Sequence, residues 1–337
     1  MDVSKLRFQR LRPLRATAAD RDKNAEVSLS AADFILPFFV VEGQGIDHPL
    51  ATLQGVSHLS IDRLVDAVAR AKAAGVSRVL LFGVLEAGLK SPDAREAVRS
   101  DSLVARAVAA LKKAHPTMTV FTDVCVCAYT DHGHCGVLNG HQIDNDASLP
   151  LLAEMALSHA RAGADFVAPS AMMDGQVAAI RARLDEEGLL KTKILGYSAK
   201  YASKLYGPFR DAAGSAPSFV DRKSYQMDPR NRLQGVQEAA ADLEEGADWV
   251  MVKPSTFYLD VMAAVKAEFP KVPLAAYHTS GETMMLRHGA AAGLFNWKEG
   301  LLENLYAIKR AGADFIITYN AVEAAEFLKG QTELPSD

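Results

Sequence analysis

Three stretches of this chain share one pattern: Ala162-Gly163-Ala164-Asp165-Phe166-Val167, Glu245-Gly246-Ala247-Asp248-Trp249-Val250 and Ala311-Gly312-Ala313-Asp314-Phe315-Ile316. Each follows a segment with a helical pattern and opens a short apolar run, with glycine at the point where a helix ends in the left-handed region. Their irregular spacing argues against a solenoid. It favours repeated βα units joined by tight helix-to-strand turns.

The apolar runs between and around these turns bring the strand count to eight. Residues 34–41 form a continuous apolar run of the kind found in a strand buried on both faces. Strands are expected near residues 35, 79, 119, 166, 194, 249, 273 and 315. Eight βα units in order predict a (β/α)8 TIM barrel of the α/β class, with a doubly wound sheet as the alternative on pattern alone.

The predicted organisation is one barrel with two additions. Residues 31–337 form the catalytic barrel domain, and residues 201–232 are too long for an ordinary connection and predict an active-site lid. Residues 1–30 carry five arginines but few large apolar side chains, so they predict an extended N-terminal arm. The residues alone leave open whether this arm is disordered or lies on a neighbouring subunit.

The composition narrows the class of protein. The chain has 337 residues, 37 basic against 41 acidic, and a formal net charge of −4, which gives no sign of nucleic-acid binding. No apolar run is long enough to span a bilayer, and the arginine-rich N-terminus has no apolar centre typical of a secretory signal. Three cysteines without paired spacing favour a reducing compartment. We therefore expect a cytoplasmic protein that acts on a small molecule.

All three cysteines lie within eleven positions of one another. Cys125 and Cys127 are expected to project from one face of an extended segment, and the turn His132-Gly133-His134-Cys135 folds the third thiol back toward them. Three thiolates suit Zn²⁺ and leave a fourth position for water or substrate, which is the catalytic arrangement. The alternative is three buried apolar cysteines.

Barrel enzymes carry their chemistry at the C-terminal ends of the strands, and the polar residues of this chain follow that rule. They are Asp123 and Cys125 at the third strand, Ser170 after the fourth, Ser198 and Lys200 after the fifth, Lys253 at the end of the sixth, His278 and Ser280 after the seventh, and Tyr319 at the end of the eighth.

Lys253 ends a wholly apolar strand, where desolvation favours the neutral amine that forms a Schiff base with a ketone. The alternative is a lysine that extends out of the barrel mouth into water. Lys200 comes from the adjacent strand and should face the same cavity. Two neighbouring lysines lower each other's proton affinity, which helps both to act as amines.

The predicted lid is basic, with Arg210, Arg222, Lys223, Arg230 and Arg232. Guanidinium groups bind carboxylates with two hydrogen bonds, so a basic lid over a lysine site suits a carboxylate substrate. The alternative is a solvated loop, because three aspartates partly balance the charge. The residues alone therefore predict a barrel enzyme that uses an amine nucleophile, a thiolate zinc site and a small keto acid.

An ordered set of motifs closely resembles the porphobilinogen synthase family, also called 5-aminolevulinate dehydratase, from about residue 12 to residue 328. The set comprises Asp123-Val124-Cys125-Val126-Cys127, His132-Gly133-His134-Cys135-Gly136, Tyr206-Gly207-Pro208-Phe209-Arg210-Asp211-Ala212-Ala213, Tyr225-Gln226-Met227-Asp228-Pro229 and Met251-Val252-Lys253-Pro254. The resemblance implies a hydro-lyase of tetrapyrrole and haem biosynthesis that condenses two 5-aminolevulinate molecules to porphobilinogen with loss of two waters.

The resemblance also implies a role for each site residue. Lys253 holds the first substrate as a Schiff base and Lys200 the second, and Asp123 assists proton transfer. Ser170, which follows the fourth strand, is expected to bind substrate as well. The implied carboxylate contacts are Ser280 and Tyr319 for the first substrate, and Arg210, Arg222 and Gln226 for the second. Zinc on Cys125, Cys127 and Cys135 polarises a carbonyl or activates a water. Glu238 matches a ligand of stimulatory Mg²⁺, and the family forms homo-octamers in which the arm embraces a neighbour.

Four positions depart from the family pattern. Ala171 stands where a carboxylate is usual, Ala128 where a proline is usual, Thr283 where an aromatic residue is usual and Asn320 where a tyrosine is usual. Such changes leave two alternatives to the dehydratase itself. One is a divergent paralogue, a Schiff-base-forming condensing enzyme on a related amino ketone. The other is a catalytically silent homologue that binds metal.

Overall fold

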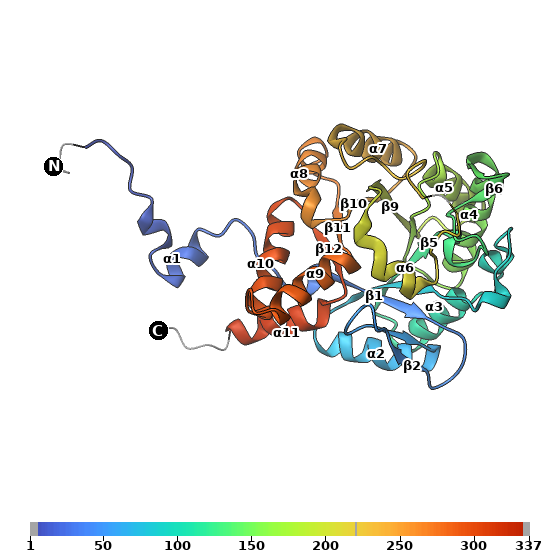
Figure 1. Ribbon diagram of the computed structural model, residues 1–337, viewed down its shortest axis with the longest axis horizontal. Coiled ribbons are helices and arrows are strands. Elements are labelled where there is room, and N and C mark those ends of the chain that lie inside the picture. Colours follow the sequence, from blue (N-terminus) through green and yellow to red (C-terminus); the bar gives the residue numbers. More distant parts are fainter. Residues whose placement is uncertain (1–5, 220, 333–337) are drawn as a thin grey trace.

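Eight parallel strands close into a barrel in the part of the chain that the computed structural model describes, which is residues 6–219 and 221–332 (Figure 1). The strands are β1 (Phe34–Val40), β4 (Arg78–Gly83), β5 (Thr119–Val124), β8 (Phe166–Pro169), β9 (Lys193–Lys200), β10 (Trp249–Lys253), β11 (Leu274–His278) and β12 (Phe315–Thr318). The last strand pairs with the first, through Phe34 with Ile316 and Ile35 with Ile317. The predicted (β/α)8 barrel is confirmed, because a doubly wound sheet does not close.

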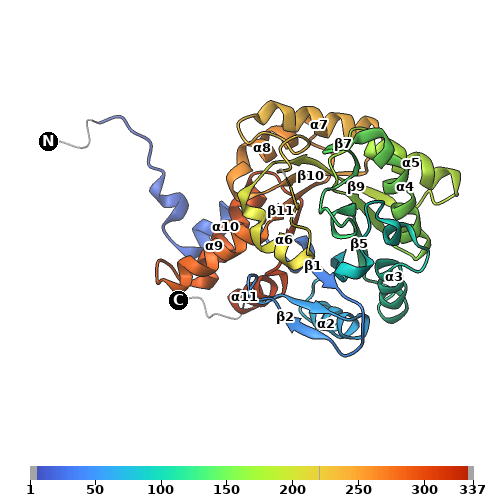
Figure 2. The same cartoon turned by 45° about the vertical axis from the view of Figure 1, so that its right-hand side comes forward.

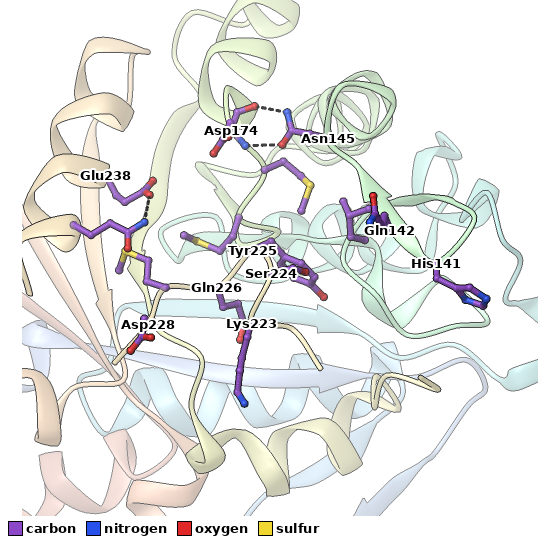
Figure 3. A pocket seen from close by; sticks show the side chains of 15 residues that line it. His141, Gln142, Asn145, Asp174, Lys223, Ser224, Tyr225, Gln226, Asp228 and Glu238 are labelled. Carbon is purple, nitrogen blue, oxygen red and sulfur yellow. Dashed lines mark hydrogen bonds between the residues drawn. The ribbon is translucent and has the colours of Figure 1, made fainter. Parts of the chain in front are cut away.

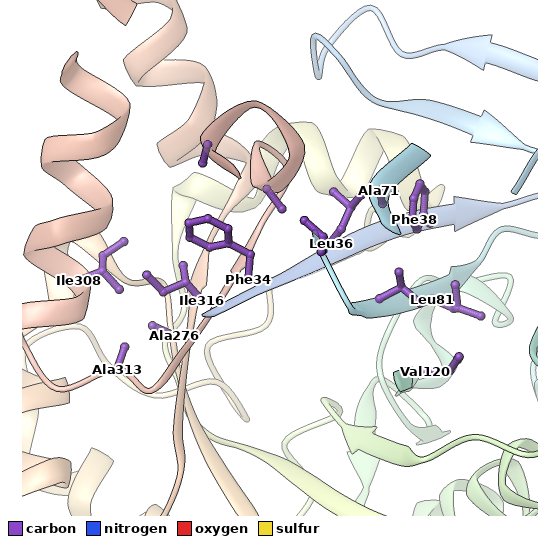
Figure 4. Packing of buried hydrophobic residues seen from close by; sticks show 14 of the residues in the cluster. Phe34, Leu36, Phe38, Ala71, Leu81, Val120, Ala276, Ile308, Ala313 and Ile316 are labelled. Carbon is purple, nitrogen blue, oxygen red and sulfur yellow. The ribbon is translucent and has the colours of Figure 1, made fainter. Parts of the chain in front are cut away.

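Continuous apolar strands arise because each strand is covered on both faces. Ile35 and Phe39 of β1 point into the barrel, where they join inward-facing residues of the other strands. The alternate residues Phe34, Leu36 and Phe38 pack outward against the helices (Figure 4). All seven residues of β1 are buried as a result, and the strand needs no polar face.

Helices follow most strands and form the outer layer of the barrel (Figure 1). They are α2 (Ile61–Ala73), α3 (Leu103–Ala114), α4 (Asn145–Arg161), α5 (Gln176–Glu186), α7 (Arg232–Glu244), α8 (Leu259–Glu268), α9 (Ser280–Ala291), α10 (Trp297–Arg310) and α11 (Ala321–Thr332). Two small antiparallel pairs add to this frame, β2 (Asp47–Pro49) with β3 (Ser57–Leu59) and β6 (Val137–Asn139) with β7 (Gln142–Asp144). None of the helices in the described ranges is both long and apolar enough to cross a bilayer.

The three repeated turns connect a helix to β8, β10 and β12, as predicted. Their glycines have φ values between +103° and +110°, which a side chain would strain. The aspartate that follows each glycine accepts a backbone N–H from the start of the preceding strand in the barrel. Asp165 binds Val120 N at 2.8 Å, Asp248 binds Ile194 N at 2.8 Å and Asp314 binds Leu274 N at 2.7 Å. These carboxylates therefore join neighbouring strands at their amino ends.

Residues 6–24 extend away from the barrel (Figure 1). They contain η2 (Arg12–Arg15) and α1 (Ala18–Lys23), and Leu6, Phe8, Leu11 and Leu14 are each about half exposed. Residues 1–5 of the predicted arm and 333–337 of the predicted barrel domain lie outside the described ranges. The predicted contact of the arm with another subunit stays a prediction.

The segment after β9 contains η7 (Lys204–Tyr206) and α6 (Gly207–Ala213), followed by irregular chain up to α7. Figure 2 shows α6 lying across the barrel strands. The lid prediction covered residues 201–232, of which residue 220 lies outside the description. This segment brings lid residues over the C-terminal ends of the strands, where the predicted site lies.

Candidate active site

Lys200 and Lys253 are paired in register at the C-terminal ends of the adjacent strands β9 and β10. Both side chains are buried, with 6% and 5% of their surface exposed. Lys253 therefore does not extend into water. The structure brings together the two amines that the sequence predicted to share a cavity.

Aromatic rings surround the Lys253 amine. Its Nζ atom lies 3.9 Å from the ring centroid of Tyr277, and 5.0, 5.1 and 5.4 Å from those of Phe209, Tyr197 and Tyr206. Burial, followed by the charge of Lys200, lowers the pKa of Lys253 to about 7. A large fraction of this amine is thus neutral near pH 7, as a nucleophile for a ketone requires.

Lys200 points to the end of the neighbouring strand β8. Its Nζ atom donates a hydrogen bond to the carbonyl oxygen of Ser170 at 2.5 Å, and Ser170 itself is 4% exposed. The Nζ atom also lies 5.6 Å from the Tyr197 ring, so this ring stands beside both lysines. Ser170 thus fixes the direction of the second amine.

Asp123 lies within β5 near its C-terminal end. Its Oδ1 atom is buried, with no hydrogen-bond partner in the described part of the chain. Burial, and then the nearby Cys127 thiol, raises the pKa of Asp123 to about 7, while Lys200 and Lys253 act in the opposite direction. A carboxyl group with this pKa can both accept and release a proton near pH 7.

The three cysteines converge on one point. Their sulfur atoms all lie within 4.8 Å of one another, and all three residues are buried. The expected extended segment is wrong at this point, because β5 ends at Val124 and η6 (Val126–Ala128) brings Cys127 back beside Cys125. Hydrogen bonds from the Cys125 and Cys127 thiols lower the pKa of Cys135. Buried thiols at this spacing fit the donor set of a zinc ion.

The loop that carries Cys135 is also the surface on which the lid rests. His134 Nε2 lies 2.9 Å from the carbonyl oxygen of Phe219, and Ser218 N donates to the carbonyl oxygen of His132 at 3.0 Å. Gly133 has φ +71°, and a Cβ atom there would lie 2.3 Å from the carbonyl oxygen of Ala216. The lid and the cysteine loop are therefore packed backbone against backbone.

Arg210 and Arg222 are the two predicted basic lid residues that face inward. Arg222 is 5% exposed and donates to the carbonyl oxygens of Gly133 at 2.8 Å and Ser215 at 2.5 Å. Burial and the charge of Arg222 lower the pKa of Arg210. Lys223 and Arg230 instead form exposed ion pairs with neighbouring aspartates, and Arg232 is exposed at the start of α7. The solvated-loop alternative thus describes these three residues but not Arg210 and Arg222.

The predicted first carboxylate contacts lie at the ends of β11 and β12. Tyr319 is 8% exposed, and its hydroxyl lies 3.1 Å from that of Tyr277. Ser280 begins α9, and its Oγ atom accepts a hydrogen bond from Phe209 N of the lid at 3.0 Å. Buried polar atoms of β9 and of the lid have no hydrogen-bond partner in the described residues: Tyr197 Oη, Gln226 Oε1 and Nε2, Arg210 Nε and Arg222 Nε.

Comparison with known proteins identifies the family that the sequence motifs resemble. The family model described as delta-aminolevulinic acid dehydratase matches residues 8–327. The chain belongs to this dehydratase family. A relative from Bacillus subtilis (strain 168), named delta-aminolevulinic acid dehydratase, is 48% identical over 321 residues, covering 95% of this chain and 98% of its own. One from Synechococcus elongatus is 45% identical over 95% of this chain and 98% of its own.

A solved structure is also similar over nearly the whole chain. The delta-aminolevulinic acid dehydratase (porphobilinogen synthase) of Toxoplasma gondii, in complex with its reaction product porphobilinogen, aligns with a TM-score of 0.94 and 41% identity, covering 98% of this chain and 96% of that one. Its fold is that of the dehydratase family, and it agrees with the closed barrel described above.

The departures from the dehydratase pattern have structural contexts of their own. Ala171 is fully buried beside Ser170, so no carboxylate stands there. Thr283 and Asn320 are buried and hydrogen-bonded to each other at 3.4 Å. Asn320 also accepts from Arg287 at 3.0 Å. Thr283 and Asn320 thus form their own buried polar pair and do not join a predicted substrate contact.

Glu238 lies apart from the lysines, in α7. It lines a cavity of about 820 Å³ bounded by the β6–β7 pair, the loop after β8, the second half of the lid and α7 (Figure 3). Glu238 accepts a hydrogen bond from Gln234 Nε2 at 3.3 Å. Figure 3 shows Asp174, whose backbone is bonded to Asn145, on another part of the wall of the same cavity. Burial, and then the charges of Asp174 and Glu245, raises the pKa of Glu238.

The sequence prediction missed the aromatic cage around Lys253. Tyr197 and Tyr277 are inward-facing residues of β9 and β11. Tyr206 and Phe209 come from η7 and α6, which together form the lid stem (residues 204–213). For the strand residues a signal was available, because a tyrosine stands among the aliphatic residues of β9 and of β11 that face the barrel interior. The apolar residues of the lid stem show no regular spacing in the sequence, so the position of Tyr206 and Phe209 beside Lys253 could not be predicted.

Proposed function

We propose that this chain is a hydro-lyase of tetrapyrrole biosynthesis that condenses two 5-aminolevulinate molecules into porphobilinogen with loss of two waters. One observation carries the proposal. Two buried lysines are paired in register beside a cluster of three thiols, within a chain of the dehydratase family.

Lys253 would take the first substrate. Its neutral amine attacks the ketone carbon, and the resulting carbinolamine loses hydroxide as water to leave a Schiff base. The pKa of about 7 supplies neutral amine, and the aromatic cage excludes bulk water from the product. Lys200 would hold the second substrate in the same way, with its direction set by Ser170.

Asp123 would move protons between the substrates. Its unpartnered Oδ1 atom and its pKa of about 7 suit a group that alternates between acid and base. The first carboxylate would bind Ser280 and Tyr319. The second would bind Arg210, Arg222 and Gln226, which offer buried N–H donors that lack partners within the described residues.

Zinc would be held by Cys125, Cys127 and Cys135. When bound, Zn²⁺ supplies a Lewis acid that polarises a carbonyl oxygen or lowers the pKa of a bound water. The cluster offers three buried sulfur donors and no carboxylate, which selects zinc over magnesium. The positive charges of Arg222 and Lys200 further favour the thiolate at Cys135.

Three finer points complete the proposal. Glu238 would contribute to an allosteric Mg²⁺ site, supported by its half-buried carboxylate near Asp174. The arm residues Leu6, Phe8, Leu11 and Leu14 would be covered by a neighbouring subunit of an octamer. The three free thiols lie close enough to one another to oxidise. Because the proposed zinc site needs them reduced, we place the chain in a reducing cytoplasm.

The test is porphobilinogen formation from 5-aminolevulinate by the purified chain, with zinc present, after chelation and after zinc is restored. We expect product that is lost on chelation and returns with zinc. Borohydride reduction with substrate should attach substrate mass at Lys253. Absence of product and of the adduct in zinc-loaded protein would favour the silent homologue, and an adduct without product would favour the divergent paralogue.

A further inference from the structure

The carboxylate of Glu282 is buried without a countercharge. The residue lies in the first turn of α9 and is 3% exposed. Among the described residues, no lysine, arginine or histidine forms an ion pair with it. A carboxylate in this position is tolerated only if hydrogen bonds replace its water.

Both oxygens of Glu282 are satisfied, and the donors come from two different loops. Oε2 accepts from Thr279 N at 2.7 Å, which is the carboxylate half of the capping box of α9, and also from Thr279 Oγ1 at 2.7 Å. Oε1 accepts from Ser255 N at 3.0 Å, from Ser255 Oγ at 3.3 Å and from Thr256 N. A capping box does not need the hydrogen bonds that Oε1 accepts from Ser255 and Thr256.

The second set of donors follows Lys253 directly in the chain. Ser255 is two residues beyond the amine, at the start of η8 (Thr256–Tyr258), and belongs to the loop after β10. Glu282 belongs to the helix that begins with Ser280, after β11. One side chain therefore ties the exit of the lysine strand to the turn that carries the predicted carboxylate contact.

The same turn also holds the lid stem. Ser280 Oγ accepts from Phe209 N, and a Cβ atom on Gly281 would lie 2.5 Å from the carbonyl oxygen of Leu205. The start of α9 and η7 are therefore packed backbone against backbone, with no room for a side chain at Gly281. A shift of this turn would therefore move the lid stem together with Ser280.

We propose that Glu282 is a positioning residue that fixes the Lys253 amine relative to the Ser280 carboxylate contact, so that the site prefers ketones bearing a carboxylate at the matching distance. The proposal rests on the proposed function, because it assumes that one substrate engages both groups. Charged acceptors make the stronger class of hydrogen bond, and misplacement of a reacting group by about 1 Å can reduce a rate by about 100-fold.

The experiment compares two ketones of equal length in borohydride trapping at Lys253. Levulinate carries a carboxylate, and 2-pentanone has a methyl group in its place. The ratio of their trapping rates measures the use of the carboxylate contact, independently of the fraction of folded protein. The variants are Glu282→Gln, which removes the charge, and Glu282→Asp, which keeps it but shortens the bridge.

The matched control is Glu299→Gln. Glu299 holds the equivalent position in the first turn of α10, where its N–H is bonded to Asn296, but its side chain is exposed. We expect this control to keep the wild-type ratio. We expect Glu282→Gln to lower the ratio by roughly tenfold or more, mainly through slower levulinate trapping, and Glu282→Asp to fall between them.

A ratio within twofold of wild type in Glu282→Gln, even with both rates or the melting temperature reduced, would reduce Glu282 to a helix cap. If Glu282→Gln does not fold, the Glu282→Asp ratio decides in the same way. Failure of the proposed function is detected separately, because the zinc-loaded wild-type chain would then form no porphobilinogen, whether or not a ketone is trapped at Lys253.

Discussion

The ring centroid of Tyr277 lies 3.9 Å from the Nζ atom of Lys253, so the amine rests on an aromatic face. Such a face stabilises the ammonium form, whereas burial and the charge of Lys200 favour the neutral form. The pKa of about 7 places Lys253 near the midpoint of its titration at neutral pH. Reactivity at this position should therefore depend steeply on pH.

Schiff-base formation at Lys253 should increase with pH through about 7, since only the neutral amine attacks a ketone. Lys200→Met removes a positive charge, so the pKa of Lys253 should rise and the midpoint should move to higher pH. Borohydride trapping with levulinate across the pH range measures both. Lys193→Met, at the opposite end of β9, is the control. An unchanged midpoint in Lys200→Met would contradict the coupling.

Arg222→Gln should raise the KM for 5-aminolevulinate by roughly 10- to 100-fold, because hydrogen bonds to a charged group contribute about 1.5–3 kcal/mol. The buried guanidinium binds the cysteine loop and the lid, and it is a proposed contact of the second carboxylate. Steady-state kinetics measures the effect. Arg230→Gln in the same lid is the control, since its side chain is 87% exposed and should leave KM unchanged. Equal effects of the two variants would show that only overall lid charge matters.

Gly133→Ala should loosen the lid. Its Cβ atom would collide with the carbonyl oxygen of Ala216, and its φ of +71° adds strain. Gly140 has a similar φ of +63° but nothing within 4 Å of an added Cβ, so Gly140→Ala carries the strain without the collision. Limited proteolysis within the lid should be faster in Gly133→Ala than in Gly140→Ala. Equal cleavage rates would mean that the cysteine loop does not hold the lid.

His159 is fully buried in α4, and neither ring nitrogen has a partner in the described residues. Burial lowers its pKa from 6.5 to about 3, so below pH 6.5 the unfolded chain binds a proton that the folded chain does not. Stability should fall by up to about 1.4 kcal/mol per pH unit between these values.

His159→Leu should remove that part of the acid sensitivity and raise the midpoint of thermal unfolding, most of all near pH 4. His48→Leu, on an exposed strand, is the control and should follow the wild-type dependence. The measurement is the unfolding midpoint from pH 7 to pH 4. A wild-type slope in His159→Leu would show that the ring does not remain neutral.

The strands were predictable because a barrel buries both faces of each one, which leaves continuous apolar runs such as that of β1. The exact ends of the strands were not predictable. The seventh strand, expected near residue 273, begins at Leu274, and the fifth continues to Lys200, a residue expected after its end. Backbone pairing sets these limits, and it does not follow from hydropathy.

The convergence of Lys200, Lys253 and the cysteines was also predictable, because parallel strands place their C-terminal residues at one rim. The turn between Cys125 and Cys127, the tyrosines around Lys253 and the double role of Glu282 were not. Each depends on contacts between segments distant in the sequence, such as Ser255 with Glu282. Local patterns carry no information about such contacts.

The carboxylates of Asp165, Asp248 and Asp314 lie at the amino ends of strands, on the rim opposite the lysines. Two of them also bind a lysine, Lys112 of α3 or Lys266 of α8, in the helix that precedes the neighbouring strand. The contacts that join neighbouring strands and the residues proposed for the chemistry therefore lie at opposite rims of the barrel. A combinatorial library can vary the mouth of the barrel while the opposite rim maintains the scaffold, so new substrate preferences can be selected without redesigning the fold.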